Sequence, residues 1–405
     1  MVGILILAVQ TPLSQLAEPM RYFDEFFLLT LMVPAVLDFL KSKGHLFGTL
    51  LVITFVYFVA VSFIFGRGYG LMQQGYQVAL HLKLFLLYLG LRTFMVTDRV
   101  TPVVERTVMF VTITTIFFLL VNWLAGPGFN DFFERGVIER FGGFRVTGIQ
   151  LKQNDALLLL SPVYILAAYK LALERRFTLF LGVTLAFLFL CIINTSRIAA
   201  AALPLVILGV LQTRFVWFLV IGFVGIAGSA ILISATQTQF EVFYTTLDQL
   251  GAIVDIESTE YIRAIMLYYG NVLAMEKFPI GAGAGTFGTV TSIDSPVYNE
   301  LGIGYLSFFQ KFQGVFDSNV GSILGEFGYV GLLIFCSLTV VMVRDIAGLR
   351  RTQPFSFLIA LILAHATLVA FTNPFFSYQI TPITYIACLI IALGPNFVKA
   401  SKADK

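Results

Sequence analysis

Three arginines next to long apolar runs carry the main chemical signal in the sequence: Arg145, Arg197 and Arg263. A guanidinium group keeps its charge and binds two phosphate oxygens at once through parallel N–H groups. Three such groups on one face of a membrane would suit a pyrophosphate. Ser196, which precedes Arg197, adds a hydroxyl that can bind the same ligand.

Each of these arginines also has a structural alternative. Arg197 lies at the junction of two apolar runs, from which its side chain can snorkel to lipid phosphates. Arg263 can form an ion pair with Glu260 or Glu276, and Arg145 is equally open to a structural role. The residue types alone leave both interpretations open.

Asp317, Ser318 and Asn319 stand where a long polar segment returns to an apolar run. A carboxylate at that point can take a proton from a sugar hydroxyl if the two lie within about 3 Å. The same residue types cap helix N-termini, and a helix that starts near Gly321 would need such a cap. Asp317 is therefore a candidate base or acceptor-orienting group, with Ser318 and Asn319 as candidate glycan ligands, and capping is the alternative.

Weaker signals come from polar residues within or after apolar runs. Lys83 and His81 can line a cleft, although a core histidine and a snorkelling lysine are the alternative. His365 and Asn373 can belong to the wall of a cleft or to helix packing.

The sequence motifs of several catalytic classes are absent. The glycine pattern from Gly283 to Gly288 spells G-x-G-x-x-G, but no strand is predicted before it, which argues against a dinucleotide site. The sequence has no P-loop, no H-E-x-x-H, no D-x-D pair and no Cys/His ligand cluster. We therefore expect no metal and no cofactor, and a transferase of this kind would need a donor that already carries a good leaving group.

The elements that must position these residues lie in lipid. Of the 405 residues, 58% are apolar and only 12% are charged, which is outside the range of soluble domains. The net charge of +3 is small, and no basic patch indicates nucleic-acid binding. The three cysteines all fall in apolar runs and are interpreted as packing residues.

Apolar runs long enough to cross about 30 Å of hydrocarbon recur along the chain and predict about twelve transmembrane helices. The predicted spans are residues 2–18, 24–40, 47–66, 76–96, 105–124, 155–171, 177–193, 198–213, 215–234, 321–343, 354–372 and 380–396. The first is interrupted by Gln10, Pro12, Ser14 and Gln15, and a half-helix or an interfacial segment is the alternative for it.

The basic residues of the short loops all fall on one side of this twelve-span arrangement. They are Lys41, Lys43, Arg99, Arg106, Lys170, Arg175, Arg176, Arg214, Arg344, Arg350, Arg351, Lys399, Lys402 and Lys405. The positive-inside rule makes that side cytoplasmic, together with both termini. We therefore expect an all-α, polytopic membrane protein that forms a single integral membrane domain over residues 1–405.

Two long connections, 125–154 and 235–320, then face outward, and loops of this length are often functional. The second has helix-like spacing in Gln239–Leu250 and Thr259–Lys277, which predicts short amphipathic helices over an outward cleft. Pro279 should end the second of these helices.

The motifs, taken in order, resemble the O-antigen ligase and Wzy-type polysaccharide polymerase superfamily. Asn194–Arg197 is similar to the S-R motif of that superfamily, and Arg145–Gly148 to its R-x-T-G segment. Arg263 followed by Phe278–Gly283 resembles its arginine helix and P-x-G-x-G stretch, and Glu326–Gly331 its E-x-G-x-x-G signature. The resemblance covers roughly residues 140 to 345, about half of the chain, and the order of these short motifs carries it.

The resemblance implies metal-independent, inverting glycosyl transfer at the periplasmic face of the bacterial inner membrane, from an undecaprenyl-pyrophosphate-linked glycan. Arg197 and Arg263 would bind the pyrophosphate, with Arg145 beside them. Ligases of this superfamily carry His-Asn nine residues before the signature glutamate, where this chain has Asp317 and Ser318. That departure favours a polymerase, in which Asp317 would orient or deprotonate the acceptor hydroxyl.

The expected partners are a lipid-linked glycan donor, a glycan acceptor and membrane lipids, with no nucleic acid. A chain-length regulator protein is expected by resemblance only. Two alternatives stay open: a ligase that transfers the glycan to lipid A core or to a protein, and a flippase for lipid-linked oligosaccharides. A flippase should show midplane charges and repeat symmetry, neither of which is clear in the sequence.

Overall fold

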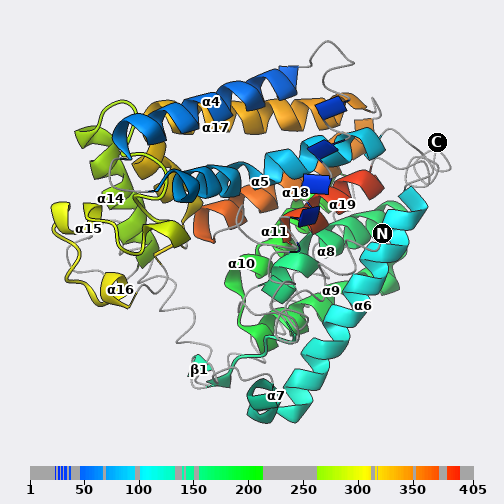
Figure 1. Ribbon diagram of the computed structural model, residues 1–405. Coiled ribbons are helices and arrows are strands. Elements are labelled where there is room, and N and C mark those ends of the chain that lie inside the picture. The colour runs from blue at the N-terminus through cyan, green and yellow to red at the C-terminus, as the bar shows by residue number, and fades with distance from the viewer. Residues whose placement is uncertain are drawn as a thin grey trace.

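The fold is described from a computed structural model of the chain (Figure 1). It describes single positions between 23 and 37, and then residues 46–66, 70–95, 101–132, 139–140, 143–149, 155–212, 262–311, 315–316, 318–349, 353–373 and 381–392. Within these ranges almost all regular structure is helical.

The first group of helices consists of α4 (Leu46–Phe65), α5 (Leu71–Met95) and α17 (Asn319–Leu349). Helix α4 packs against both others, and α14 (Ile262–Glu276) lies along the first half of α17. Figure 1 shows α4 and α17 side by side across the top of the view, with α14 at their left end.

The second group packs around α8 and is inclined to the first (Figure 1). Its members are α6 (Thr101–Ala125), α8 (Asp155–Leu173), α9 (Phe177–Asn194), α10 (Arg197–Ala200), α11 (Ala202–Gln212) and α19 (Thr381–Ala392). Helix α18 (Gln353–Thr372) contacts α8, α11 and α19 on one side and α17 on the other, so it joins the two groups.

Short elements complete the connections between these helices. They are α7 (Pro127–Phe132), β1 (Glu139–Arg140), β2 (Gly143–Phe144), the 3-10 turn η2 (Val290–Ser292), α15 (Val297–Glu300) and α16 (Ser307–Gln310). Strands β1 and β2 form a two-residue antiparallel ladder. An all-α prediction did not include this ladder, because two residues give no readable period.

Five of the described helices are long and apolar enough to cross a membrane: Leu46–Phe65, Thr101–Ala125, Asp155–Leu173, Phe177–Asn194 and Asn319–Ile346. Shorter apolar helices accompany them at Ile198–Val210, Phe357–Ala370 and Thr381–Ala392. The protein is therefore a helical membrane protein. Its apolar surface agrees with this, since Phe63 on α4 is 72% exposed to the surroundings of the protein.

Most predicted spans with described residues coincide with a helix, and the helix at Thr259–Lys277 is confirmed as α14. The predicted span 198–213 differs, because it is divided at Ala201 into α10 and α11. Spans 2–18 and 215–234 and the helix Gln239–Leu250 lie outside the described residues, and 24–40 is described only at single positions.

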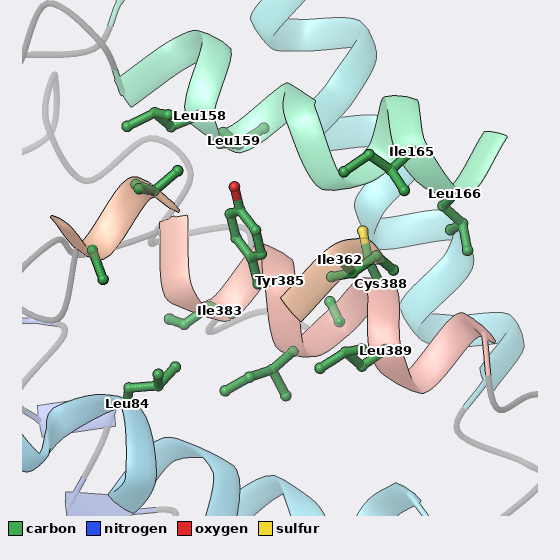
Figure 2. Packing of buried hydrophobic residues seen from close by; sticks show 14 of the residues in the cluster. Leu84, Leu158, Leu159, Ile165, Leu166, Ile362, Ile383, Tyr385, Cys388 and Leu389 are labelled. Carbon is green, nitrogen blue, oxygen red and sulfur yellow. The ribbon is translucent and has the colours of Figure 1, made fainter. Parts of the chain in front are cut away.

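The core lies where α19 packs between α8 and α5 (Figure 2). Figure 2 shows Leu158, Leu159 and Ile165 of α8 on one side of α19 and Leu84 of α5 on the other. Every residue of α19 is buried, which explains why so short a helix keeps its place between longer ones.

Candidate functional site

The segment after β2 carries Arg145 into the protein interior. Arg145 is only 1% exposed, and its Nε donates a hydrogen bond to the backbone carbonyl of Asn194, at 2.8 Å. The Asn194 side chain donates in return to the carbonyl of Val146, at 2.5 Å. These bonds dock the predicted R-x-T-G segment directly on the end of α9.

Asn122, near the end of α6, fixes the same segment from the other side. Its Oδ1 accepts hydrogen bonds from the backbone N–H groups of Thr147, at 2.9 Å, and Gly148, at 3.0 Å. Gly148 has a φ of +64°, a left-handed conformation that favours glycine. Arg145 is thus held between α6 and α9 by backbone hydrogen bonds.

The turn that follows α9 presents Arg197. Thr195 adopts a left-handed conformation, with φ 54° and ψ 33°, which is unfavourable for a β-branched residue and is common where strain serves a site. Ser196 occupies the position before α10, and Arg197 is the first residue of that helix. The Arg197 side chain lies outside the described part of the chain, so the structure places its backbone only.

The hydroxyls of this turn are buried. Thr195 Oγ1 and Ser196 Oγ have no hydrogen-bond partner, and Ser196 is 3% exposed. Ser196 therefore precedes α10 without capping it through its side chain. Buried polar atoms in proteins are almost always paired, so two unpaired hydroxyls in one turn are an energetically costly arrangement that a hydrogen-bonding ligand would relieve.

His365 of α18 fastens the first turn of α10. Its Nε2 lies 3.1 Å from the carbonyl of Ile198, and its Nδ1 lies 2.5 Å from the hydroxyl of Tyr385 on α19. A carbonyl oxygen can only accept a hydrogen bond, so we assign the ring proton of His365 to Nε2, which donates to Ile198. The other ring nitrogen, Nδ1, then accepts a hydrogen bond from the hydroxyl of Tyr385. His365 thus belongs to the wall beside the Arg197 turn.

The beginning of α17 gathers the second set of predicted residues. Ser318 Oγ accepts a hydrogen bond from the backbone N–H of Gly321, at 3.2 Å, which is a helix N-cap. Asn319 Nδ2 donates to the carbonyl of Asn373, directly after α18, at 3.2 Å. Of the three residues predicted either to cap a helix or to bind glycan, Ser318 is the one that caps α17. Asp317 lies outside the described residues.

Arg263 lies in the first turn of α14 and is half-buried. Helix α14 packs closely on the beginning of α17, where a Cβ added to Gly270 would lie 2.5 Å from the carbonyl oxygen of Gly321. The first turns of α14 and α17 therefore belong to the same end of the helix group (Figure 1).

Helix α18 connects the two sets of residues. Its residue His365 contacts α10, and Asn373, at its end, contacts Asn319. In Figure 1 the end of α18 lies on the same side of the molecule as α14 and the beginning of α17. The structure brings Arg145 to the turn of Ser196 and Arg197. It connects Asn319, beside Ser318, to that turn through α18, whereas Arg263 lies on α14, which packs on α17.

The structure thus bonds a buried guanidinium to the residue that precedes a turn with two unpaired buried hydroxyls, and groups of both kinds are able to bind an anion. No protein-family model matches this chain, and no curated protein matches it. The functional interpretation therefore rests on the residues and on their geometry.

A separate buried network surrounds Glu326 of α17, which is 0% exposed. Its Oε1 accepts from the backbone N–H of Gly285, at 2.7 Å, and from the hydroxyl of Thr289, at 3.0 Å. Its Oε2 pairs with His81 Nε2 of α5 at 2.8 Å, and Gln77 Nε2 lies 3.1 Å from the same ring nitrogen. This carboxylate ties the glycine-rich loop to two membrane helices.

The glycine-rich loop is consequently a packed structural element. It follows a helix and no strand, and Glu326 occupies the N–H of Gly285, which a nucleotide phosphate would need. Gly281, with a φ of +75°, lies against the kink of α17 at Gly328, where an added Cβ would be 2.5 Å from the backbone nitrogen. Both observations agree with the prediction that this is no dinucleotide site.

Lys83 lies apart from the arginine segments, on α5, and is 3% exposed. A snorkelling lysine would expose its ammonium group, so this alternative is wrong for Lys83. His81, two residues earlier, is buried and paired with Glu326.

Sequence reasoning missed Tyr385 and Thr381 of α19. Thr381 is 0% exposed, and its Oγ1 has no hydrogen-bond partner. The available signal was weak: two polar residues four positions apart in an apolar run, which places them on one helix face.

Proposed function

We propose that the protein polymerises undecaprenyl-pyrophosphate-linked oligosaccharide repeat units at the outer face of the bacterial inner membrane. One observation carries the proposal: the buried guanidinium of Arg145 is docked on the turn that begins α10 with Arg197, in a helical membrane protein. A buried cation next to a helix start is suited to phosphate oxygens.

The reaction is an inverting glycosyl transfer that uses no metal. A hydroxyl oxygen of the acceptor glycan attacks the anomeric carbon of the donor from the face opposite to the diphosphate. The bond from that carbon to the phosphate oxygen breaks, and the diphosphate leaves with the bonding electrons. Arg197 and Arg263 neutralise the charge that develops on it, and Asp317 takes the acceptor proton.

The proposed topology has about twelve spans, with both termini in the cytoplasm. Residues 125–154 and 235–320 form the periplasmic connections of a single membrane domain. The basic loop residues support this orientation, since they fall on one side of the twelve-span arrangement. Arg145 and α14 then belong to the two outward connections, where a lipid-linked glycan would meet them.

The direct test is reconstitution of the purified protein in vesicles with lipid-linked repeat units, without added metal or nucleotide. We expect a ladder of longer glycans. Arg197→Ala and Arg263→Ala should abolish the ladder at unchanged protein levels. Arg344→Ala is the matched control, because this exposed arginine lies at the far end of α17.

Other outcomes would point to other functions. Transfer of the glycan to added lipid A core, without elongation, would identify a ligase. Translocation of the lipid-linked unit at constant glycan length would identify a flippase. Full activity of both arginine variants would remove Arg197 and Arg263 from the mechanism.

A further inference from the structure

Helix α14 presents apolar side chains on the side that does not pack against the protein. Tyr268 and Met275 are exposed there, Met275 to 64%, and Phe278, just beyond the helix, is 69% exposed. Positions 268, 271 and 275 are three or four residues apart, so they share one face of the helix. The turn after α14 continues this face, because the N–H of Phe278 donates to the carbonyl of Met275, at 3.3 Å.

The helix carries no charge between its two ends. Its charged residues are Arg263 in the first turn and Glu276 at the end, and the twelve residues from Ala264 to Met275 include no others. A helix with one side in water normally has charged residues on that side. The exposed face of α14 is therefore suited to an apolar environment.

This face continues an exposed apolar stripe of α17. Leu333 and Val340 in that stripe are 68% and 65% exposed, on a helix long and apolar enough to cross a membrane. Tyr329 lies one turn before Leu333; its hydroxyl donates to Asn271 Oδ1 of α14 at 2.7 Å, and its ring centroid lies 6.0 Å from that of Phe278. Lipid that covers Leu333 therefore meets Phe278 one helical turn further along.

The length of α17 sets the depth of this contact. Arg344 is the first exposed charged residue at the other end of the stripe. About 30 Å of hydrocarbon takes roughly 20 helical residues, which reach Leu324 when they are counted back from Arg344. Tyr329 is five residues inside that boundary, so Tyr329 and Phe278 lie about 7 Å below it. An interfacial helix buries its apolar face to about 5–10 Å.

Helix α14 is too short to cross the membrane. Its 15 residues cover about 22 Å, against about 30 Å of hydrocarbon. Glu276 and Lys277 are exposed beside Phe278, and the long stem of Lys277 allows its ammonium group to reach the lipid head groups. Both features limit the helix to the surface layer of the bilayer.

We propose that α14 is an interfacial helix whose residues Tyr268, Met275 and Phe278 contact the acyl chains of bilayer lipid. Lipid is the occupant because this face meets the exposed stripe of α17 at Tyr329, so a protein that covered α14 would also have to displace lipid from α17. The proposal rests on the contacts and composition of α14 and is independent of the proposed glycan chemistry.

The test is quenching of tryptophan fluorescence by lipids that carry bromine on their acyl chains. The full-length chain, with both native tryptophans replaced by phenylalanine, receives Phe278→Trp and is reconstituted in vesicles of brominated phosphatidylcholine. Leu333→Trp is the control for lipid contact. Glu300→Trp is the control for water, because an exposed carboxylate at the end of α15 is costly to place in lipid.

We expect the brominated lipid to quench Phe278→Trp at least about threefold more strongly than Glu300→Trp. Met275→Trp should behave as Phe278→Trp does, and it provides the same readout if the Phe278 variant does not fold. Bromine near the head group should quench Phe278→Trp more than Leu333→Trp, and bromine near the chain end should show the opposite order. The reverse depth order would contradict the interfacial position.

Iodide, which stays in water, separates the other possibilities. Quenching of Phe278→Trp and Met275→Trp by iodide as strongly as Glu300→Trp would place this face in water and overturn the proposal. Protection from both quenchers would show that protein covers the face, which would also overturn it. Quenching by lipid without glycan elongation would retain the interfacial helix and refute the polymerase, whereas elongation with quenching by iodide would do the reverse.

Discussion

Glu326 should be the most sensitive single position in the glycine-rich loop. Its carboxylate bonds to the N–H of Gly285, the hydroxyl of Thr289 and the ring of His81, and all of these groups are buried. Glu326→Ala leaves three partners unsatisfied, each at a cost of about 1–3 kcal/mol. Partial relaxation reduces the sum, so we expect a destabilisation of about 3–5 kcal/mol.

Glu326→Gln separates hydrogen bonding from charge. The amide oxygen can take the place of Oε1 toward Gly285 and Thr289. The amide nitrogen can donate to His81 Nε2 once the ring proton moves from Nε2, where it faces the wild-type carboxylate, to Nδ1. Only the additional strength of a charged acceptor is lost, so we expect a cost of about 1–2 kcal/mol.

The assay is thermal unfolding of the purified variants in one detergent, together with limited proteolysis of the loop. Glu326→Ala should lower the midpoint strongly and expose residues 281–289 to cleavage, and Glu326→Gln should resemble the wild type. A combined Glu326→Ala, His81→Ala variant should be less destabilised than the sum of the single variants. If alanine costs less than about 1 kcal/mol, or if glutamine is as damaging as alanine, the reasoning from these hydrogen bonds is refuted.

Three further predictions concern the site and its supports. Asn122→Ala should cost about 2 kcal/mol and speed proteolysis near Arg145, because two backbone N–H groups lose their acceptor, whereas Asn122→Asp should be mild. Thr381→Val should raise the free energy of unfolding by about 1 kcal/mol, and with it the thermal midpoint, because it removes an unpaired buried hydroxyl. A lower midpoint would contradict the assignment of this hydroxyl as unpaired. Gly281→Ala should lower the free energy of unfolding by about 3 kcal/mol or more, and Gly302→Ala by about 1 kcal/mol. Both glycines have a positive φ, but only at Gly281 would the added Cβ also clash with backbone atoms of α17. Equal thermal midpoints of the two variants would contradict this packing.

The apolar runs predicted most of the described helices because hydrophobicity over about 20 residues is a local property. Helix α5 begins at Leu71, five residues before the predicted start at 76, and this early turn carries Gln73, which donates to the carbonyl of Thr291. The division of residues 198–213 into α10 and α11 was also not predicted, although Pro204 in the first turn of α11 is a signal for it. A proline has no N–H to donate, and its ring clashes with the carbonyl four residues earlier, which is that of Ala200 at the end of α10.

Of the candidate site, only the arginines could be predicted from the sequence. Their residue type and their position beside apolar runs indicated anion binding, and the structure docks Arg145 on the turn before Arg197. The pairing of His81 with Glu326 joins residues 245 positions apart, and a single sequence holds no record of such contacts. For the same reason the sequence did not reveal that Asn122 holds the Arg145 segment.

The central claim is that Arg197 and Arg263 face one common pocket. The most direct measurement is thiol cross-linking between Arg197→Cys and Arg263→Cys in membranes, in a chain whose native cysteines are replaced by serine, with a short bifunctional reagent. Cysteines at Asn319 and Asn373, which are hydrogen-bonded neighbours, serve as the positive control. We predict cross-linking of the arginine pair; cross-linking of the control pair alone would contradict the account.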